Sequence, residues 1–438
     1  MKGFQIGILI FFGAFLFLGV MVFSGAIKIP QKNSTPVQTL GGAVNIWGTI
    51  PKKNLNTAIT FLNNQPGNIK INYTEKDPRT YEADLLNAFA FGGVPDVVIL
   101  SQDLIARYED KLITIPYTSF SERTFVDTYI RAADVFKVPT GFLGFPIFSD
   151  PLVMYYNRDL LEAGGFANPP KYWKDLAVYV PKLTKKNEAL QISTAGIALG
   201  EFSNIKNAKE IFLAMNLQLN NPVVVKDVGG RYNTVLAEQS DVSSQPAIQS
   251  VNYFNEFSNP LKNIYSWNKS KQNSENEFIS GDLAIYFGLA SELQTLRNKN
   301  PNLNFDIAMI PQVEELNSRI TYSDAYALAI PIAAPNAQAA LTVAGNLANG
   351  SNTASFVGPS GFIPMRRDLI ASGISATKYN SVLYDAALNS RSWFDVNDEN
   401  TTNIFAKMME DVTSGLSTAN ESVKTADTSL KQLLIKFK

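Results

Sequence analysis

Three aspartates are the first candidates for chemistry in this sequence: Asp103, Asp150 and Asp324. Asp150 lies in the stretch GFPIFSDPLVMYYNRDL (144–160), where it separates a Phe-Pro-Ile segment from an apolar run. A carboxylate can accept hydrogen bonds from the hydroxyls of a ligand, and two carboxylates can act together as acid and base. Asp150 is therefore either an ordinary turn residue or a residue that faces a ligand. Asp103 is equally open, because it could cap a helix beginning at Leu104.

Aromatic residues could supply the other part of a ligand site, because their rings cover an apolar face of a ligand while the carboxylates bind its polar groups. Trp267 and Trp393 lie in polar surroundings, IYSWNKS and RSWFDVND, so we expect them to face a partner or a cleft. Trp47 suits the core of a strand as well as a ligand contact. The residues predicted to bind a ligand are Trp47, Thr49, Ser101, Asp103, Ser149, Asp150, Trp267, Phe287, Asp324, Tyr326 and Trp393.

The composition excludes several kinds of catalysis. The 438 residues include no Cys and no His, which rules out Ser-His-Asp and Cys-His catalysis, the HExxH zinc site, Cys-ligated zinc and disulfides. An enzyme would have to use carboxylates, Lys, Tyr or a bound cofactor. We expect no catalytic residue, no cofactor and no metal site. Peptide, polyamine and metal ligands stay open as alternatives, and a metal would have to be held by oxygen ligands alone. The formal net charge of −1 does not indicate a nucleic-acid partner.

The N-terminus is predicted to be a membrane anchor. Residues 4–27 are apolar apart from one Gln and one Ser, and a spanning helix needs about 20 such residues, whereas a secretory signal has about 7–15. The small residues at 24–26 leave a cleaved signal as the alternative. We expect residues 1–30 to form the anchor or signal and residues 31–42 a flexible linker. The protein is then expected on the outer face of the cytoplasmic membrane, or exported if the segment is cleaved.

The segment after the linker predicts alternating strands and helices. Residues 43–50 and 95–100 are apolar strands by their pattern, and residues 68–73 alternate as a strand does. Apolar residues at helical spacing predict one helix over 55–62 and another over 81–89. This order indicates a parallel α/β layer, in which ligands bind at the carboxyl ends of the strands. The residues at that edge are Trp47 to Thr49 and Ser101 to Asp103.

The rest of the chain adds strands and a helical C-terminal third. Residues 151–157 predict a strand, after which Asn157 can cap a helix that Gly164 and Gly165 can end. The Lys-rich segment 182–188 is predicted to be an exposed helix face. Further strands are predicted over 278–288, 305–311 and 326–334, a helix over 335–349 and a plain turn at the glycines of 226–233.

Several motifs in order resemble one family. The segment 144–176, GFPIFSDPLVMYYNRDLLEAGGFANPPKYWKDL, is similar to the corresponding part of the extracellular solute-binding proteins of ABC importers, family 1, the maltose-binding-protein-like group. The resemblance covers nearly the whole chain from about residue 43. The other matching motifs are VNIWG (44–48), GGVPDVVIL (92–100), FISGDLAIYFG (278–288) and SGFIPMRRDLI (360–370).

The resemblance implies two α/β lobes, joined by a hinge, whose interlobe cleft closes on a ligand that is commonly a sugar. By position, Asp150 matches an acid that contacts sugar hydroxyls, Asp103 falls where another such acid sits, and Trp47 matches a tryptophan of the first strand. The implied lobes are 43–146 with 311–357, and 147–310 with 358–438.

Two departures from the family pattern are clear. Many relatives carry an aromatic residue after the Pro-Asp strand, where this chain has Leu100, and a Trp after the glycine of the 278–288 motif, where this chain has GLASEL. Maltodextrin specificity is therefore not implied.

The resulting expectation is a monomeric protein that binds a small polar solute, a carbohydrate by the resemblance, and delivers it to the permease subunits of an ABC transporter, with the N-terminal helix in the membrane. Two alternatives stay open. One is an anchored sensory or scaffold protein that kept the fold. The other is a carboxylate-dependent glycoside hydrolase using Asp103 and Asp150, which would need a carboxyl separation of about 5–5.5 Å or 6.5–9.5 Å.

Overall fold

The computed structural model describes residues 43–65, 69–189, 191–316, 318–373 and 379–436. The predicted anchor (1–30) and linker (31–42) lie outside these described residues. Within the described part of the chain, no helix has the length and apolar character needed to cross a bilayer.

A parallel layer forms the first part of the fold, as the alternation of strands and helices predicts. Strand β1 (Val44–Gly48) pairs in parallel with β2 (Ile71–Glu75) on one side and β3 (Val97–Ser101) on the other. The connecting helices are α2 (Lys52–Asn63) and α3 (Tyr81–Phe91). The buried residues of α2 are those whose spacing predicts its apolar face: Leu55, Ala58, Ile59 and Leu62.

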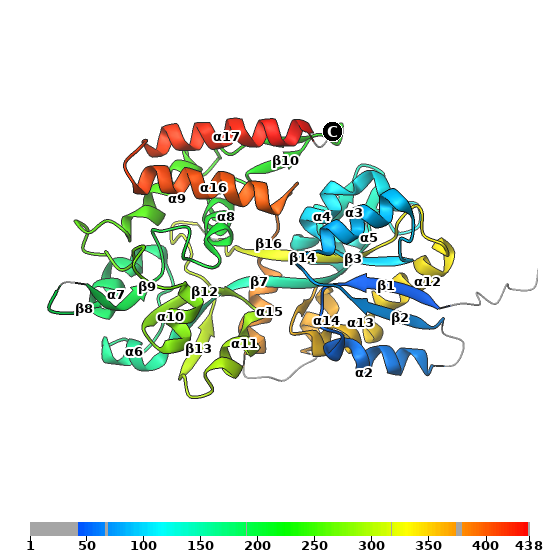
Figure 1. Ribbon diagram of the computed structural model, residues 1–438, viewed down its shortest axis with the longest axis horizontal. Helices are drawn as coiled ribbons and strands as arrows, with labels where there is room; N and C mark the ends of the chain where they lie inside the picture. The colour runs from blue at the N-terminus through cyan, green and yellow to red at the C-terminus, as the bar shows by residue number, and fades with distance from the viewer. Residues whose placement is uncertain (1–42, 66–68, 190, 317, 374–378, 437–438) are drawn as a thin grey trace, which may run out of the picture. The chain divides into compact units, whose positions relative to one another are not determined.

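Two long strands connect the two halves of the molecule (Figure 1). β7 (Phe145–Asn157) pairs with β14 (Thr321–Ala329) along its first half and with β12 (Leu283–Leu289) and β13 (Phe305–Ala308) along its second. β14 in turn pairs antiparallel with β3. With β9 (Ile192–Ile197) and β8 (Lys185–Lys186), the strand order β2-β1-β3-β14-β7-β12-β9-β8 is continuous. β7 and β14, here called the hinge strands, lie in its middle.

The part that contains β1 to β3 is called the N-lobe. Its helices pack on the sheet and on each other, as the contacts of α12 with β1, α13 with α2 and α14 with α5 show. Its further elements are α4 (Gln102–Arg107), η1 (Glu109–Lys111), β4 (Thr114–Pro116), α5 (Glu122–Thr128), η2 (Arg131–Phe136), β5 (Lys137–Val138), β6 (Gly141–Leu143), α12 (Ala337–Leu347), α13 (Gly350–Val357), η4 (Gly358–Ser360), β15 (Ile363–Pro364) and α14 (Arg367–Ser372).

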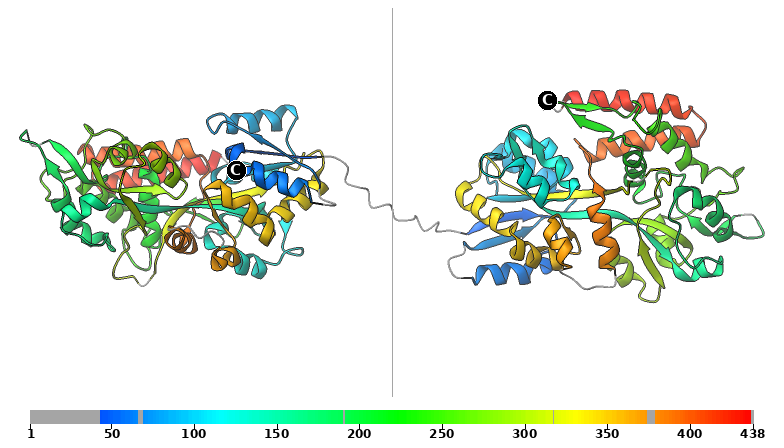
Figure 2. Two further views of the ribbon diagram at one scale, coloured as in Figure 1. Left: turned by 90° about the horizontal axis from the view of Figure 1, so that it is seen from below. Right: turned by 180° about the vertical axis from the view of Figure 1, so that it is seen from behind.

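The part that contains β9 and β12 is called the C-lobe. Its last helices, α16 (Asp398–Thr413) and α17 (Ala419–Lys436), lie side by side (Figures 1 and 2). Its further elements are α6 (Arg158–Ala163), η3 (Trp173–Asp175), α7 (Leu176–Leu183), β8 (Lys185–Lys186), β9 (Ile192–Ile197), α8 (Ala208–Gln218), β10 (Val224–Lys226), β11 (Tyr232–Thr234), α9 (Pro246–Glu256), α10 (Ser274–Ser280) and α11 (Glu292–Lys299). α15 (Asn380–Leu388) and β16 (Ser390–Arg391) contact the hinge strands.

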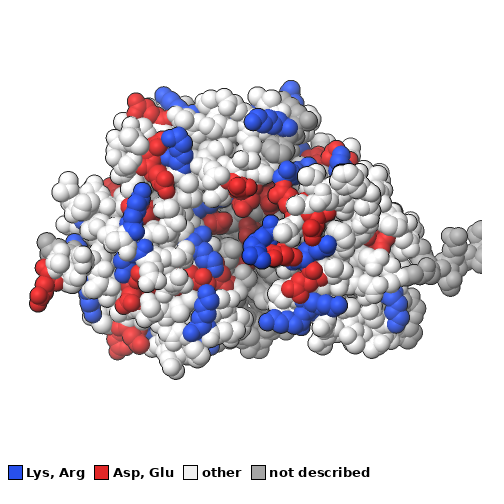
Figure 3. Space-filling model, viewed as in Figure 1, with Lys and Arg blue, Asp and Glu red and all other residues white. Residues whose placement is uncertain are grey.

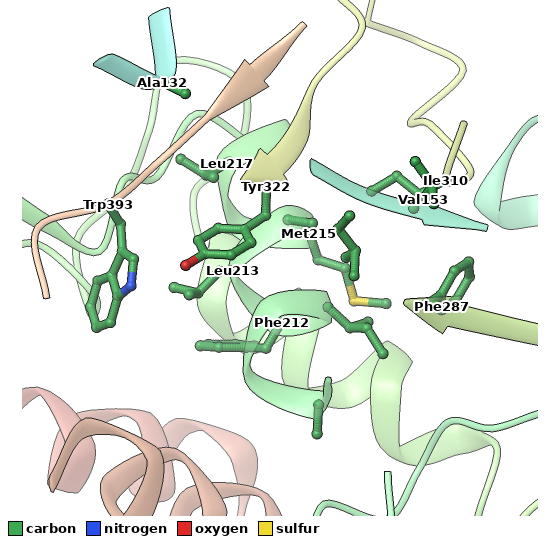
Figure 4. Packing of buried hydrophobic residues seen from close by; sticks show 14 of the residues in the cluster. Ala132, Val153, Phe212, Leu213, Met215, Leu217, Phe287, Ile310, Tyr322 and Trp393 are labelled. Atoms are coloured by element: carbon green, nitrogen blue, oxygen red, sulfur yellow. The ribbon is translucent and has the colours of Figure 1, made fainter. Parts of the chain in front are cut away.

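The apolar core of the C-lobe reaches the hinge strands through α8. This helix is buried along nearly its whole length, and its Phe212, Leu213 and Met215 lie beside Tyr322 of β14 and near Trp393 (Figure 4). A helix that is apolar on most sides has to lie inside the protein. The packing therefore connects the C-lobe to β14, which itself pairs with the N-lobe strand β3.

Three predicted elements are corrected. Phe278 to Ser280 end helix α10, because Gly281 adopts a left-handed conformation with φ of 88° that stops the helix, and β12 starts only after it. β14 covers 321–329, not 326–334, because its polar first half still pairs with β7. The segment 182–188 is not a helix face throughout, since Lys185 and Lys186 form the short strand β8.

Candidate functional site

One face of the hinge strands carries two of the candidate aspartates. Asp150 of β7 lies opposite Asp324 of β14, and Phe148 lies opposite Tyr326. Because side chains alternate along a strand, these four side chains project from the same face of the pair. We call this face the acidic hinge face.

Asp150 is almost completely buried, with 2% of its surface exposed. The backbone N–H of Ser291, which follows β12 in the C-lobe, donates a hydrogen bond of 2.8 Å to its Oδ1. Burial raises the pKa of Asp150 to about 8, and the nearby carboxyl of Asp324 adds to the rise, whereas the bond from Ser291 opposes it. At neutral pH this carboxyl therefore holds its proton readily and can donate as well as accept.

Asp324 is held by two partners. Its Oδ1 accepts hydrogen bonds from Gln102 Nε2 at 3.0 Å and from the hydroxyl of Tyr322 at 2.6 Å. Gln102 also accepts a bond from the N–H of Ala325 through Oε1 at 2.8 Å. The start of α4 is thereby fixed to β14. Burial raises the pKa of Asp324 in spite of these two hydrogen bonds.

Asp103 lies in the first turn of α4, across from the start of α16. It keeps some exposed surface, but protein atoms surround it closely, and this burial raises its pKa to about 7. The carboxylates of Asp395 and Asp398 raise it further. Because Asp103 belongs to the N-lobe and α16 to the C-lobe, the two lobes meet here with acids on both sides.

A buried lysine neutralises part of this charge. Lys209, at the start of α8, contacts Asp395 Oδ2 at 2.5 Å, Asp398 Oδ1 at 2.7 Å and Thr401 Oγ1 at 2.8 Å. Burial alone would lower the pKa of Lys209, but the carboxylates around it hold that pKa above its ordinary value. Glu210, the next residue, is half-buried, and the surrounding protein raises its pKa to about 8, to which the carboxyl of Asp324 contributes.

Acidic side chains also gather around a hollow of the molecular surface (Figure 3). In the space-filling view, acidic side chains line the upper part of the hollow in the middle of the molecule (Figure 3). Near the other end of the hinge face, a cavity of about 130 Å³ opens beside Ser291 and Phe362. The rings of Phe362 and Tyr326 are 5.4 Å apart. The arrangement combines carboxyl groups with aromatic faces, which suits a ligand with hydroxyls and an apolar ring face.

The structure brings five predicted residues together at this place: Ser101, Asp103, Asp150, Asp324 and Tyr326. Ser101 ends β3 and lies opposite Tyr326 in the register. Trp47 and Thr49 lie at the carboxyl end of β1, as predicted, but the ammonium of Lys76 already covers the ring of Trp47 at 3.7 Å from its centroid.

Three predicted residues lie elsewhere. Ser149 projects from the opposite face of β7, where its hydroxyl bonds Ser323 at 2.9 Å. Trp267 is fully buried, and its Nε1 donates to Asn204 Oδ1 at 2.8 Å, so its polar neighbours in sequence surround a core residue. Phe287 is also buried and packs edge-on against Trp173.

Trp393 lies within the C-lobe core and is 2% exposed. Its ring lies 5.7 Å from Phe405, and Lys209 Nζ lies 5.2 Å from its centroid. The indole N–H has no hydrogen-bond partner among the described residues. Trp393 is thus close to the acids without being exposed to solvent.

Sequence reasoning missed several residues of the site. They are Lys209, Glu210, Ser291, Tyr322, Asp395 and Asp398, whereas Gln102 lies within the predicted edge Ser101 to Asp103. Two signals could have pointed to some of them. Tyr322, Asp324 and Tyr326 are two residues apart along the chain, which places them on one face of a strand. Asn397 caps α16 by accepting the N–H of Asn400, and it stands between Asp395 and Asp398 in the sequence.

A family model for the bacterial extracellular solute-binding proteins matches residues 52–349. No curated protein sequence gives a significant match. The sugar-binding protein MalE from Xanthomonas citri is similar in structure, with a TM-score of 0.72 and 18% identity over 90% of this chain and 98% of that chain.

Two further solved structures are similar to this chain. The GacH receptor of Streptomyces glaucescens, solved without ligand and with acarbose, has a TM-score of 0.69 and 15% identity over 91% of this chain and 99% of that chain. An ABC substrate-binding protein from Listeria monocytogenes, in complex with cycloalternan, has a TM-score of 0.68 and 16% identity over 89% and 98% of the two chains. These likenesses establish the two-lobe α/β fold.

Proposed function

Because the chain belongs to the family of bacterial extracellular solute-binding proteins, we propose that it captures a sugar or oligosaccharide between its lobes and delivers it to the permease of an ABC transporter. The observation that carries this proposal is the acidic hinge face. It places Asp150, Asp324 and Tyr326 on the two strands that join the lobes, with Asp103 beside them. A ligand bound there touches both lobes and the hinge, so binding favours the closed arrangement.

The carboxyl groups and the aromatic rings recognise different parts of the sugar. Asp103 and Asp150 exchange hydrogen bonds with sugar hydroxyls, and their raised pKa values allow each to donate or to accept. Tyr326 and Phe362 cover an apolar ring face. Affinity comes from many hydrogen bonds in a site shielded from water, and no covalent step is needed. The solute is expected to leave unchanged.

The apolar N-terminal segment completes the proposal. Residues 4–27 serve as a membrane anchor, and the polar stretch 31–42 is a tether that keeps the binding lobes near a membrane permease. The protein then acts at the outer face of the cytoplasmic membrane as a monomer.

The proposal is tested by thermal unfolding of the full-length protein in a detergent without a sugar headgroup. The panel contains mono- and oligosaccharides, amino acids and polyamines. A ligand that binds only the folded state adds about 2.7 kcal/mol at a hundred times its Kd, which raises the melting temperature. A shift with a sugar that is recovered chemically intact supports the proposal. A shift only with non-sugars, no shift at all, or recovery of hydrolysed sugar contradicts it.

A further inference from the structure

A β-hairpin of the C-lobe reaches an acidic residue of the N-lobe, away from the acidic hinge face. Lys226, the last residue of β10, places its Nζ 2.7 Å from Oε2 of Glu109 in η1. The hydroxyl of Tyr232, the first residue of β11, donates to the same oxygen at 3.0 Å. We propose that Glu109, Lys226 and Tyr232 form an interlobe clasp that holds the closed arrangement and sets how long a ligand stays bound, an inference that rests on the proposed function.

The hairpin is firmly attached to the C-lobe. Lys226 and Tyr232 are directly paired across the two strands. In the turn, Asp227 Oδ1 accepts the N–H groups of Gly229 and Arg231 at 2.9 Å each. At the base, Thr234 donates to Asp427 of α17 at 2.9 Å. The two clasp donors therefore move with the C-lobe and not as a loose loop.

The chain enters the hairpin in a strained conformation. Val223 has φ of 65°, a region that a β-branched residue rarely adopts. Asn221 maintains it, because its Oδ1 accepts the N–H of Val223 at 2.8 Å while its Nδ2 donates to the carbonyl of Val235 at 3.0 Å. Such strain persists only where the surroundings enforce it. Here it sets the direction in which the hairpin leaves the C-lobe toward Glu109.

On the other side, Glu109 is tied to the candidate site by a short piece of chain. It follows α4, whose first residues are Gln102 and Asp103. Gln102 is fixed to β14, so α4 and η1 belong to the N-lobe side of the hinge. Separation of the lobes at Asp103 therefore moves Glu109 away from Lys226 and breaks both bonds of the clasp.

The clasp adjoins, through Lys226, a groove between the lobes. The groove has a volume of about 610 Å³, and its walls come from Tyr117 and Lys137 of the N-lobe, from Lys226 and from Ser392 and Trp393. Three polar atoms of these walls are buried without a hydrogen-bond partner among the described residues: Tyr117 Oη, Ser392 Oγ and Trp393 Nε1. Opening gives such groups access to water. The clasp thus opposes a tendency of this seam to open.

The burial of the pair gives it more weight than a surface ion pair. The side chain of Lys226 is 9% exposed and that of Glu109 is 35% exposed. Removing one member leaves the other as a poorly solvated charge or an unpaired acceptor. The matched control is the pair Lys407–Asp411 at 2.8 Å, which lies within α16, so its loss leaves the interlobe distance unchanged.

The test measures the distance between the lobes in the full-length protein. Since the chain has no Cys, one spin label can be placed on each lobe by Phe91→Cys and Leu261→Cys, two residues that are 88% and 92% exposed. Pulsed dipolar spectroscopy then compares the wild type with Glu109→Gln, Lys226→Met, Tyr232→Phe and the control Asp411→Asn, all first without ligand. We expect the open population to be larger than in the wild type in the three clasp variants. In the control variant it should equal that of the wild type.

The second readout is the dissociation rate of the panel sugar that binds. We expect it to rise roughly tenfold in Glu109→Gln and less in Tyr232→Phe, because truncating a partly buried, hydrogen-bonded charge pair acts mainly on dissociation. The double variant Glu109→Gln/Lys226→Met should change less than the sum of the single variants.

The two proposals fail separately. If no sugar binds, the proposed function fails. The interlobe distances measured without ligand still test the clasp in that case. If a sugar binds but the folded clasp variants show wild-type distances and dissociation rates, the clasp is overturned while the proposed function stands. If Glu109→Gln does not fold, Tyr232→Phe, which loses only a hydroxyl, decides in its place.

Discussion

Two groups of acids, each with one buried member, Asp395 and Asp150, lie close together and are stabilised in opposite ways. Asp395 and Asp398 are paired with Lys209, which also bonds Thr401. Asp150 and Asp324 face each other on the hinge strands, and the hydrogen bonds to them come from neutral groups, namely Ser291, Gln102 and Tyr322. The first group is an internally satisfied ion network, whereas the second has raised pKa values and is ready to respond to a ligand.

The difference teaches that a buried acid by itself does not mark a binding site. Both groups combine a buried acid with nearby acids, yet among the residues that the structure describes a cation forms ion pairs with the first group alone. The paired group connects α8 to α16 and is expected to serve stability. The unpaired group joins the lobes and is expected to serve binding. Three experiments can break or sharpen this comparison.

The largest effect is expected from Lys209→Met. It leaves Asp395, which is 2% exposed, without its cation, and breaking one side of such a buried pair costs about 3–5 kcal/mol. Urea unfolding of the full-length protein measures the change in the free energy of unfolding. The control is Lys407→Met, which breaks an exposed pair on α16 and should cost less than about 1 kcal/mol. If the two variants changed the free energy of unfolding equally, the expected role of the paired group in stability would be wrong.

The next effect concerns the pH dependence of Asp150. Its folded pKa of about 8 lies above the ordinary value of about 3.9, so the folded protein binds its proton more tightly than the unfolded chain does. This group therefore stabilises the fold fully below about pH 4, and that stability is lost as the pH rises through 8. Asp150→Asn should match the wild type at pH 4 and be more stable at pH 8, on the order of a few kcal/mol.

Urea unfolding at pH 4, 6 and 8 checks this expectation. The amide oxygen of the Asp150→Asn side chain can still accept the bond from the N–H of Ser291, so the substitution isolates the charge. A difference between the two proteins that is independent of pH would show that Asp150 does not titrate in this range.

The smallest effect in free energy is the most direct test of binding. Asp150→Ala should weaken sugar binding by roughly tenfold, about 1.4 kcal/mol, because it removes a hydrogen-bonding group from the acidic hinge face. Ser149→Ala is the matched control, since Ser149 is the neighbouring residue but projects from the opposite face. Calorimetric titration compares both with the wild type. If both variants lost the same affinity, or if Asp150→Ala bound the sugar normally, the acidic hinge face would not be the site that contacts the ligand.

Local patterns predicted much of the fold. The apolar spacing of Leu55, Ala58, Ile59 and Leu62 gave the buried face of α2, and Asn157 caps α6 by accepting the N–H of Leu160. These features depend on residues a few positions apart, so a short window contains their cause. The 278–288 prediction erred because a helix end and a strand with similar apolar content adjoin at Gly281.

The candidate site was predictable only in part. Asp103, Asp150 and Asp324 were visible as acids beside expected strands, but Trp267 and Phe287 could not be told from core residues. Trp267 lies among polar residues in the chain, yet its partner Asn204 is 63 positions away. Burial depends on which segments pack together, and that information does not lie in the immediate neighbours of a residue.

The sequence by itself determined the parallel α/β layer, the edge at which its strands end and the absence of His and Cys chemistry, because each follows from residue types and short spacings. Only the tertiary structure decided which acids acquire a cation. Lys209 meets Asp395 across 186 positions and Lys226 meets Glu109 across 117, while Asp150 lies opposite Asp324 and is hydrogen-bonded by the backbone of Ser291. The physical reason is that the charge state of an acid depends on burial and on neighbours within a few ångströms, which packing brings together from distant parts of the chain.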